Sequence, residues 1–280
     1  MKKTLRNTTA AILVSAVSAT AALADSAKEV AVAEMAALFV TFDAAAAEKV
    51  MAKDLIQHNP SIPSGSAPLI GFIPALKESG ISATTHRLIS EGDLVVAHNE
   101  YKNAKLFGGD HLVAFDVFRI KDGKVAEHWD NITAFAKPNP SGRTQLDGTT
   151  KITDLDKTVQ NKAMVTDFMN TVMIGGDGSR ITDFISTETY IQHNSGVADG
   201  LSALGGALAA MAANGQPMTY SKTHIIVAEG NFVFAASEGS FLGKSSAFYD
   251  LFRIDGGKVV EHWDVITDMP TKSANDNGKF

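Results

Sequence analysis

The sequence predicts an α+β protein in which one domain occurs twice in tandem. Three motifs return 134 or 135 residues later: EHWD at 127–130 and 261–264, IQHN at 56–59 and 191–194, and FDVFRI at 115–120 as YDLFRI at 249–254. The motifs keep their order and nearly keep their spacing across more than a hundred residues. A repeat of this length indicates two copies of a whole domain rather than a solenoid.

Each copy begins with helical sequence and ends with strands. Stretches rich in Ala, Met and Leu predict the first helices over 27–53 and 157–174, and shorter helices are expected over 66–78 and 200–213. Alternating or β-branched runs predict four strands in each copy, at 82–90, 93–101, 111–120 and 124–135, then at 218–228, 231–238, 245–254 and 258–267. Helices followed by consecutive strands predict an antiparallel sheet that curls around the helices.

The chain divides into five predicted segments. These are a signal peptide over 1–24, a first domain over 25–137, a linker over 138–156, a second domain over 157–270 and a tail over 271–280. The linker is predicted from the prolines, glycine and small polar residues that follow Lys137.

The first 24 residues have the pattern of a secretory signal. Basic residues precede a short apolar run, which ends in the small-residue site Ala22-Leu23-Ala24. Cleavage after Ala24 and a periplasmic or secreted location are therefore expected. The apolar run is too short for a permanent membrane span, which makes a retained anchor the less favoured alternative.

Composition limits the partners. The 280 residues are 45% hydrophobic, which is typical of a protein with a real core. Without the three basic residues of the leader, 22 basic residues face 31 acidic ones, a net charge of −9. Such a surface repels phosphate backbones, so we expect no nucleic-acid partner. Because the apolar run of the leader is short, we also expect no stable membrane insertion. The chain has no cysteine, which excludes disulfides and thiol chemistry.

The loop between the last two strands determines which side chains share a face. It is Lys121-Asp122-Gly123 in the first copy and Asp255-Gly256-Gly257 in the second, and the glycine predicts a three-residue loop with a type I turn and a G1 bulge. That loop pairs Asp116 with His128, whereas a two-residue loop would place Asp116 beside Trp129.

The three-residue loop brings Asp116, His128 and Asp130 to one face of a concave sheet. The opposite face then takes three neighbours that are expected to be structural: Phe115, Glu127 and Trp129. Two carboxylates in a partly apolar cavity cannot both ionise cheaply, so one should have a raised pKa and exchange protons near neutral pH. The alternative is that these are ordinary polar residues. The second copy has the corresponding set Asp250, His262 and Asp264.

Together with SEGDLVVAH at 90–98 and FDVFRIKDGK at 115–124, the repeated motifs resemble the SnoaL-like polyketide cyclases. These belong to the superfamily that includes ketosteroid isomerase and nuclear transport factor. The resemblance implies a cone in each domain, with long helices across a strongly curved antiparallel sheet and an apolar pocket inside. It also implies acid/base chemistry by an aspartate, without a cofactor, on an enolisable substrate.

By motif position, the resemblance gives the acid/base role to Asp130 and, in the second copy, to Asp264. Asp116 and Asp250 stand where the cyclases can have a histidine. The resemblance implies that further polar groups line the cavity: His98, His58 and Asn59 in the first copy and His193 and Asn194 in the second.

We therefore expect a lyase or isomerase with one pocket per domain, acting on a small apolar or carbonyl-containing ligand. The first domain is the better candidate for activity, because the second has Ala236 where the first has His98. The two cones are expected to pair as an intramolecular pseudo-dimer.

Two alternatives remain open. One is an exported, non-catalytic protein that binds a small ligand. The other is a metal site built from the histidines of the first copy, which are His58, His86, His98, His111 and His128. Their spacing matches no metal-binding motif, so neither a metal nor a cofactor is expected.

Overall fold

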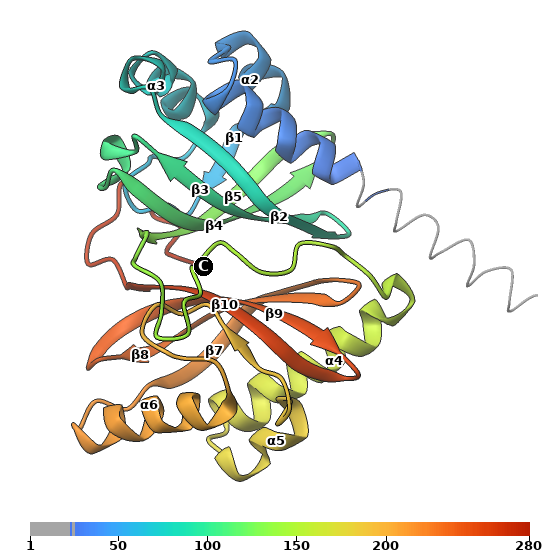
Figure 1. Cartoon of the computed structure of the whole chain (residues 1–280). Coiled ribbons are helices and arrows are strands. Elements are labelled where there is room, and N and C mark those ends of the chain that lie inside the picture. Colours follow the sequence, from blue (N-terminus) through green and yellow to red (C-terminus); the bar gives the residue numbers. More distant parts are fainter. Residues whose placement is uncertain (1–22, 24–25) are drawn as a thin grey trace, which may run out of the picture.

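The fold consists of two α+β units whose sheets face each other, with the helices on the two outer sides (Figure 1). It is seen in a computed structural model that describes residues 23 and 26–280, so the predicted signal peptide, apart from Leu23, lies outside the described residues. The two five-stranded sheets have matching orders, β1-β5-β4-β3-β2 and β6-β10-β9-β8-β7. The predicted α+β class with two tandem units is confirmed.

The first unit opens with a helix over residues 26–39, which has no label in Figure 1. Its other elements are α2 (Ala44–Val50), β1 (Met51–Gln57), α3 (Ser66–Ser79), β2 (Ser82–Glu91), β3 (Leu94–Lys102), a 3₁₀ turn (Lys105–Phe107), β4 (His111–Lys121) and β5 (Lys124–Ala134). The Asp43 side chain caps α2 by accepting from the amides of Ala45 and Ala46. Gly80 ends α3 at a φ of 67°, the left-handed conformation that favours glycine.

The second unit repeats this plan with a more irregular start. Its elements are a 3₁₀ turn (Leu155–Lys157), α4 (Thr158–Phe168), a π-helical stretch (Met169–Ile174), a second 3₁₀ turn (Gly178–Arg180), α5 (Ile181–Phe184), β6 (Ile191–Gln192), α6 (Leu201–Ala213), β7 (Thr219–Glu229), β8 (Phe232–Phe241), β9 (Lys244–Asp255) and β10 (Lys258–Asp268). Among the described residues, no helix is both long enough and apolar enough to cross a membrane.

Each sheet contains one strand that the sequence pattern did not predict. β1 and β6 lie at the sheet edges and pair in parallel with β5 and β10. The sequence pattern predicts a helix that includes residues 51–53, but these residues begin β1. The sequence Met-Ala-Lys favours a helix locally, and the pairing with β5 overrides that preference.

The predicted three-residue hairpin loop is wrong. Lys121 pairs with Lys124, and Asp122 and Gly123 form a two-residue turn with φ of 52° and 71°. Positive φ at both positions is the type I′ turn, whose twist matches the strands. In the second unit Gly256 and Gly257 form the same turn, with φ of 56° and 74°.

A bulge in β5 then corrects the register. Ile120 pairs with Val125 and Arg119 pairs with Glu127, so Ala126 is the extra residue. As a result, Asp116 lies opposite Asp130 rather than His128. The observed register differs from the predicted one by two residues. Because side chains alternate with a period of two, the predicted grouping on one face survives.

The sheets pack on each other through one buried cluster. It includes Val96, Phe115, Val117 and Trp129 from the first sheet and Phe232, Phe234, Tyr249 and Trp263 from the second. Polar contacts cross this interface as well: Asn131 Nδ2 donates to the carbonyls of Ala247 and Val265. The opposite face of each sheet packs against the helices of its own unit, and the cavities lie there.

Candidate active site

The first unit encloses a cavity of about 430 Å³ between its helices and the concave face of its sheet. Most of the wall is apolar: Met35, Leu38, Phe39, Leu69, Phe72, Leu76, Phe107, Phe118 and Ile132. The polar groups of the wall are Glu34, Asn59, Ser61, Tyr101, Asp116, His128 and Asp130. A few polar groups in a largely apolar cavity are what an orienting site for a small molecule needs.

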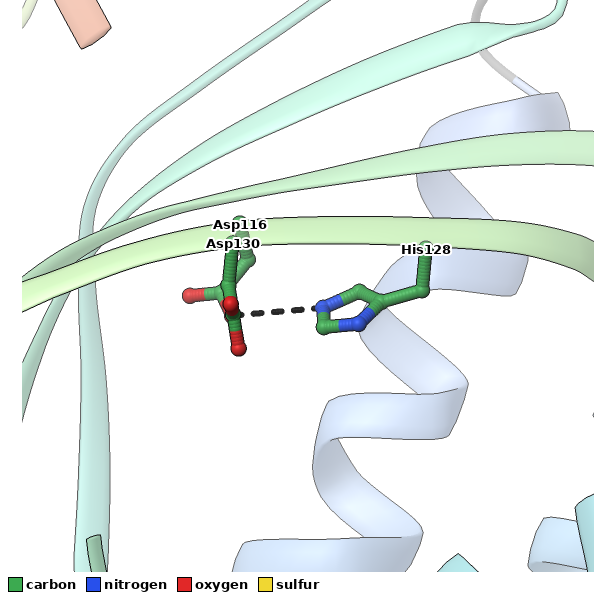
Figure 2. A group of neighbouring side chains, drawn as sticks. All are labelled: Asp116, His128 and Asp130. Atoms are coloured by element: carbon green, nitrogen blue, oxygen red, sulfur yellow. Dashed lines mark hydrogen bonds and ion pairs between the residues drawn. The ribbon is translucent and has the colours of Figure 1, made fainter. Parts of the chain in front are cut away.

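Two carboxylates and an imidazole form the centre of this wall. Asp116 on β4 and Asp130 on β5 are cross-strand partners, and His128 lies two residues before Asp130 on the same face. Figure 2 shows the His128 ring directed at the Asp116 carboxylate, with Nε2 3.4 Å from Oδ1. The structure thus brings together three of the predicted site residues.

Asp116 is held by two donors from β3. Its Oδ2 accepts from Asn99 Nδ2 at 2.7 Å and from the Tyr101 hydroxyl at 3.0 Å. Burial, together with the charge of Asp116, raises the pKa of Tyr101 well above its usual value, so the phenol keeps its proton. Asp116 is therefore an anchored acceptor rather than a free base.

Asp130 keeps more of its carboxylate available. Asn59 Nδ2 donates to Oδ2, and Lys279 Nζ lies 3.9 Å from Oδ1. Asp130 is 5% exposed and lines the cavity, so a ligand can reach it without bulk water surrounding it.

The surroundings of His128 favour its charged form. Its Nδ1 donates to Gln57 Oε1 at 3.0 Å. Burial lowers the pKa of His128, but the hydrogen bond to Asp116 and the charges of Asp130 and Glu34 outweigh burial and raise the pKa above its usual value. A protonated imidazole between two carboxylates reduces their mutual repulsion.

Glu34 is a site residue that sequence reasoning missed. It comes from the helix over 26–39, is 2% exposed and lines the cavity, and its Oε2 has no hydrogen-bond partner among the described residues. Burial raises its pKa to about 7, with the nearby charge of His128 acting against this and that of Asp116 adding to it. The signal was a single acid in the apolar stretch 30–39, VAVAEMAALF.

His98 does not belong to this cavity, and its predicted place there is wrong. It pairs with Phe115 across the sheet and stacks on it with ring centroids 4.3 Å apart, so it faces the second sheet. Burial and the charge of Arg87 hold the pKa of His98 well below its usual value. Arg87 Nη1 donates to its Nδ1 at 3.1 Å, which requires that nitrogen to be unprotonated.

The predicted pairs of cavity residues separate in the same way. His58 stacks on Trp129 and lies 3.0 Å from Glu127 Oε1, while its neighbour Asn59 points into the cavity. In the second unit His193 stacks on Trp263, whereas Asn194 donates to Asp264. Alternation along the chain explains the split: the two asparagines line the cavities and the two histidines do not.

The second unit has its own cavity of about 530 Å³. Asp264, His262 and Asn194 line it, and Asp250 lies beside it with Oδ1 3.0 Å from His262 Nε2. Burial raises the pKa of Asp264, and the charge of His262 acts against this. Several methionines and aliphatic residues complete the wall: Met173, Met211, Met218, Leu204 and Ile266.

The two sites differ in their charged groups. No Glu lines the second cavity, whose wall in the described residues carries Tyr190 as a further buried polar group. Burial and the charges of Asp264 and Asp250 raise the pKa of Tyr190, so it remains a neutral phenol. The first site thus has a buried glutamate with a raised pKa, Glu34, in addition to its pair of aspartates, and no glutamate lines the second cavity in the described part of the chain.

The histidine cluster considered as a metal site does not form. His86 and His111 both lie at Glu100, 3.4 and 2.7 Å from its carboxylate, while His58 and His98 face the second sheet. The residues that could instead offer ligand atoms within 4.8 Å of one another are Asp116, His128 and Asp130, and in the second unit Asp250, His262 and Asp264.

Comparison with known families identifies the first unit. Residues 32–128 match the family described as SnoaL-like domain. These residues form a SnoaL-like domain. The match begins within the helix that carries Glu34 and ends within β5 at His128, two residues before Asp130.

Solved structures resemble parts of the chain at low identity. TsrD from Streptomyces laurentii is 21% identical, with 39% of this chain and 88% of that chain covered and a TM-score of 0.33. An LEH-like epoxide hydrolase of M. tuberculosis is 16% identical, with 39% and 84% covered and a TM-score of 0.33. IdmH from Streptomyces antibioticus, a proposed polyketide cyclase, is 15% identical, with 38% and 91% covered and a TM-score of 0.32. No curated protein sequence matches the chain.

Proposed function

We propose that the SnoaL-like domain is a cofactor-independent lyase or isomerase that moves protons on a small, enolisable, largely apolar substrate. One observation carries the proposal. A buried base, Asp130, and a buried acid with a pKa of about 7, Glu34, line the same apolar cavity. A simple hydrophobic carrier has no need of such a pair.

Asp130 is the proposed base. Its carboxylate takes the proton from the carbon next to a substrate carbonyl, and the electrons of the C–H bond move into the enolate. Asn59 holds the carboxylate in place through its hydrogen bond to Oδ2. Positioned proton transfer of this kind contributes roughly 10²–10⁴-fold to a rate.

Glu34 is the proposed acid. With a pKa of about 7, it is about half protonated at neutral pH and can donate a hydrogen bond or a proton to the forming enolate oxygen. His128 and Asp116 support this arrangement, because the His128 ring lies close to both aspartates and its raised pKa favours a positive charge there. The enolate then takes its proton back at another carbon or attacks a second carbonyl within the same molecule.

The second unit is proposed to act mainly in ligand binding and as the packing partner of the first. Its methionine-lined wall suits ligands of varied shape, because thioether side chains adapt to irregular surfaces. The alternative for the whole chain is an exported protein that binds a small ligand without catalysis. A periplasmic or secreted location is a further proposal and rests on the sequence of residues 1–24.

Proton exchange in D₂O tests the function without knowledge of the natural substrate. A panel of small ketones and β-ketoesters is incubated with the protein, and NMR follows the loss of the α-proton signal. We expect Asp130→Asn to slow the exchange by about 100-fold or more. Asp264→Asn is expected to slow it by no more than about twofold, as a site outside the reacting cavity would.

The outcomes separate the alternatives. Equal losses in the two variants would contradict the assignment of chemistry to the first unit. Saturable binding of panel members to wild type, with exchange no faster than in buffer, would favour the binding protein instead.

A further inference from the structure

Residues 270–280 follow the last strand of the second unit, yet they bind the first unit. Figure 1 shows the end marked C lying between the two sheets. Asn275 Nδ2 donates to the carbonyls of Asn59 and Ile62 at 2.8 and 2.9 Å. Asn277 Nδ2 donates to the carbonyl of Gln57 at 2.9 Å and to a neighbouring serine hydroxyl. These contacts fix the loop over 57–64, which carries Asn59.

The end of this segment also reaches the strand that carries the proposed base. Lys279 is 8% exposed, and its Nζ donates to the carbonyl of Asp130. Gly278 accepts from His58 Nδ1 at 3.0 Å. Phe280 stacks on His224 of the second unit with ring centroids 4.2 Å apart, so the segment joins both sheets.

The second site is held by a segment that follows the first unit. Residues 138–149 follow the last strand of the first unit, and Asn139 Nδ2 donates to the carbonyls of Gln192 and Val197 at 2.7 and 2.8 Å. Thr144 accepts from His193 Nδ1 at 2.7 Å, as Gly278 accepts from His58. The loop over 192–199 carries Asn194, the donor to Asp264.

We propose that each of these segments is a positioning strap for the site of the other unit, and that the strap over 270–280 aims Asn59 and Asp130 in the first cavity. Neither segment lines a cavity among the described residues. The straps therefore act through the loops they hold, and Asn275, Asn277 and Lys279 are positioning residues.

One difference between the two straps lies next to the proposed base. Counting from the residues that accept from His58 and His193, Gln145 corresponds to Lys279. Gln145 Oε1 accepts from the amide of Ala136, so the second strap places no ammonium at its site through that residue. The first strap adds a buried cation 3.9 Å from the carboxylate of Asp130. The lysine is thus found at the site to which we assign the chemistry, and its counterpart in the other strap is a neutral glutamine.

Hydrogen exchange of the ligand-free protein tests the straps independently of any activity. In the double variant Asn275→Ala/Asn277→Ala, peptides covering 57–65 are expected to exchange roughly fivefold to tenfold faster, because four hydrogen bonds to that loop are lost. Peptides covering 192–199 are expected to be unchanged. Asn139→Ala is expected to give the opposite pattern.

Two results would overturn the proposal. One is unchanged exchange over 57–65 in the double variant, which would mean that the strap does not hold the loop. The other is an equal rise in both loops in either variant, which would mean that the segments support general stability rather than one site each.

The link to catalysis rests on the proposed function and has a separate readout. In the α-proton exchange assay, the Asn275→Ala/Asn277→Ala variant is expected to lose about tenfold in kcat with KM nearly unchanged. The reason is that Asn59 no longer holds the Asp130 carboxylate in its position, while the apolar wall that binds the substrate is intact. Lys279→Met is expected to lose activity and Lys279→Arg to retain most of it, because arginine keeps a donor and a positive charge. Lys272→Ala is the control, since Lys272 is exposed and makes none of the strap's hydrogen bonds.

The two assays fail in different ways. A chain without any exchange activity contradicts the proposed function and leaves the loop measurements intact as the test of the straps. An active chain whose kcat is unchanged in the double variant, despite a loosened loop, would overturn the positioning role.

Discussion

Asp116 and Asp130 lie directly opposite each other on neighbouring strands, and the second unit repeats the pair as Asp250 and Asp264. Like charges in cross-strand positions are unfavourable unless something neutralises them. In each unit a histidine does so, His128 beside Asp116 and His262 beside Asp250. The two aspartates and the histidine of each unit therefore form one electrostatic cluster, in which the ionisation of each group depends on the other two.

This dependence predicts how His128 responds when its partner is removed. In Asp116→Asn the hydrogen bond and the charge that raise the pKa of His128 are lost, while its burial remains. We expect the pKa of His128, followed by NMR of its ring protons, to fall. Asp250→Asn is the matched control, because it removes the partner of His262 and leaves that of His128 in place.

The same change has a consequence for stability. A histidine with a raised folded-state pKa stabilises the fold below its unfolded pKa of 6.5, and this stabilisation is lost as the pH rises through the folded-state value. Wild type should therefore lose stability over that range, and Asp116→Asn should lose less. A steeper loss in Asp116→Asn would contradict the assignment.

Glu34 is predicted to lower stability in exchange for its chemistry. Its pKa rises from 4.5 to about 7 on folding, so the folded state is favoured below pH 4.5 and loses about 3 kcal/mol as the pH rises through 7. Glu34→Gln removes the ionisation. Urea unfolding should show the variant gaining stability relative to wild type between pH 5 and pH 8 by about that amount.

The activity of the same variant should move in the opposite direction. Glu34→Gln is expected to lose α-proton exchange by about 100-fold, because the amide cannot transfer a proton. Glu29→Gln is the control, since Glu29 lies on the same helix but is exposed. A variant that is more stable at pH 8 and fully active would remove Glu34 from the mechanism.

The sequence allowed the fold to be predicted more fully than the site. Repeated motifs and alternating strands predicted two α+β units and the shared face of Asp116, His128 and Asp130. That face was predicted from an incorrect loop, and it survived because the observed two-residue turn plus bulge changes the register by two residues. The edge strands β1 and β6 escaped prediction, because pairing with distant partners defines them rather than local preference.

The errors in the site have one physical cause. A motif names neighbours in the chain, but neighbours on a strand point to opposite sides of the sheet. His58 and His193 accordingly leave the cavities that Asn59 and Asn194 line, and His98 faces the other sheet. Glu34 and the straps could not be found from the motifs, since they reach the sites from a helix and from segments distant in sequence.

Arg87 is predicted to be a main support of the packing between the two units. It donates to the carbonyls of Leu146, Asp147 and Thr149 and lies over the Trp263 ring, 4.1 Å from its centroid. Arg87→Met keeps much of the volume but removes the hydrogen bonds to all three carbonyls, and the carbonyls of Leu146 and Thr149 lose their side-chain donor, while Asp147 still accepts from Trp263 Nε1. We expect a loss of about 3 kcal/mol or more in the free energy of unfolding, measured with urea.

The control for Arg87 is another arginine near the same segment. Arg143 pairs with Asp199 at 3.1 Å and is 43% exposed, so Arg143→Met should cost less than about 1 kcal/mol. A loss in Arg87→Met as small as that in Arg143→Met would show that the contacts of Arg87 with the segment over 138–149 contribute little to the packing of the units.

The last prediction concerns metal ions at the carboxylate pair. Three ligand atoms from Asp116, His128 and Asp130 lie within 4.8 Å of one another, which is a geometry that a divalent cation could use. Each group already has a partner, however. Asp116 Oδ2 accepts two hydrogen bonds, Asp130 Oδ2 accepts one from Asn59, and His128 Nε2 lies 3.4 Å from Asp116 Oδ1. A cation would have to displace the imidazole proton and break these contacts.

We therefore expect dialysis against a chelator to leave α-proton exchange within about twofold of its starting rate, and added Zn²⁺ or Mn²⁺ to give no stoichiometric binding in calorimetry. Asp130→Asn provides the comparison. If the wild type binds one equivalent of metal tightly, the variant loses that binding and chelation abolishes turnover, then the carboxylate pair is a metal centre and the cofactor-free mechanism is wrong. Turnover that survives chelation is the result that the proposed mechanism requires, in which Asp130 takes the proton from the substrate carbon and Glu34, whose pKa is raised to about 7, donates to the enolate oxygen.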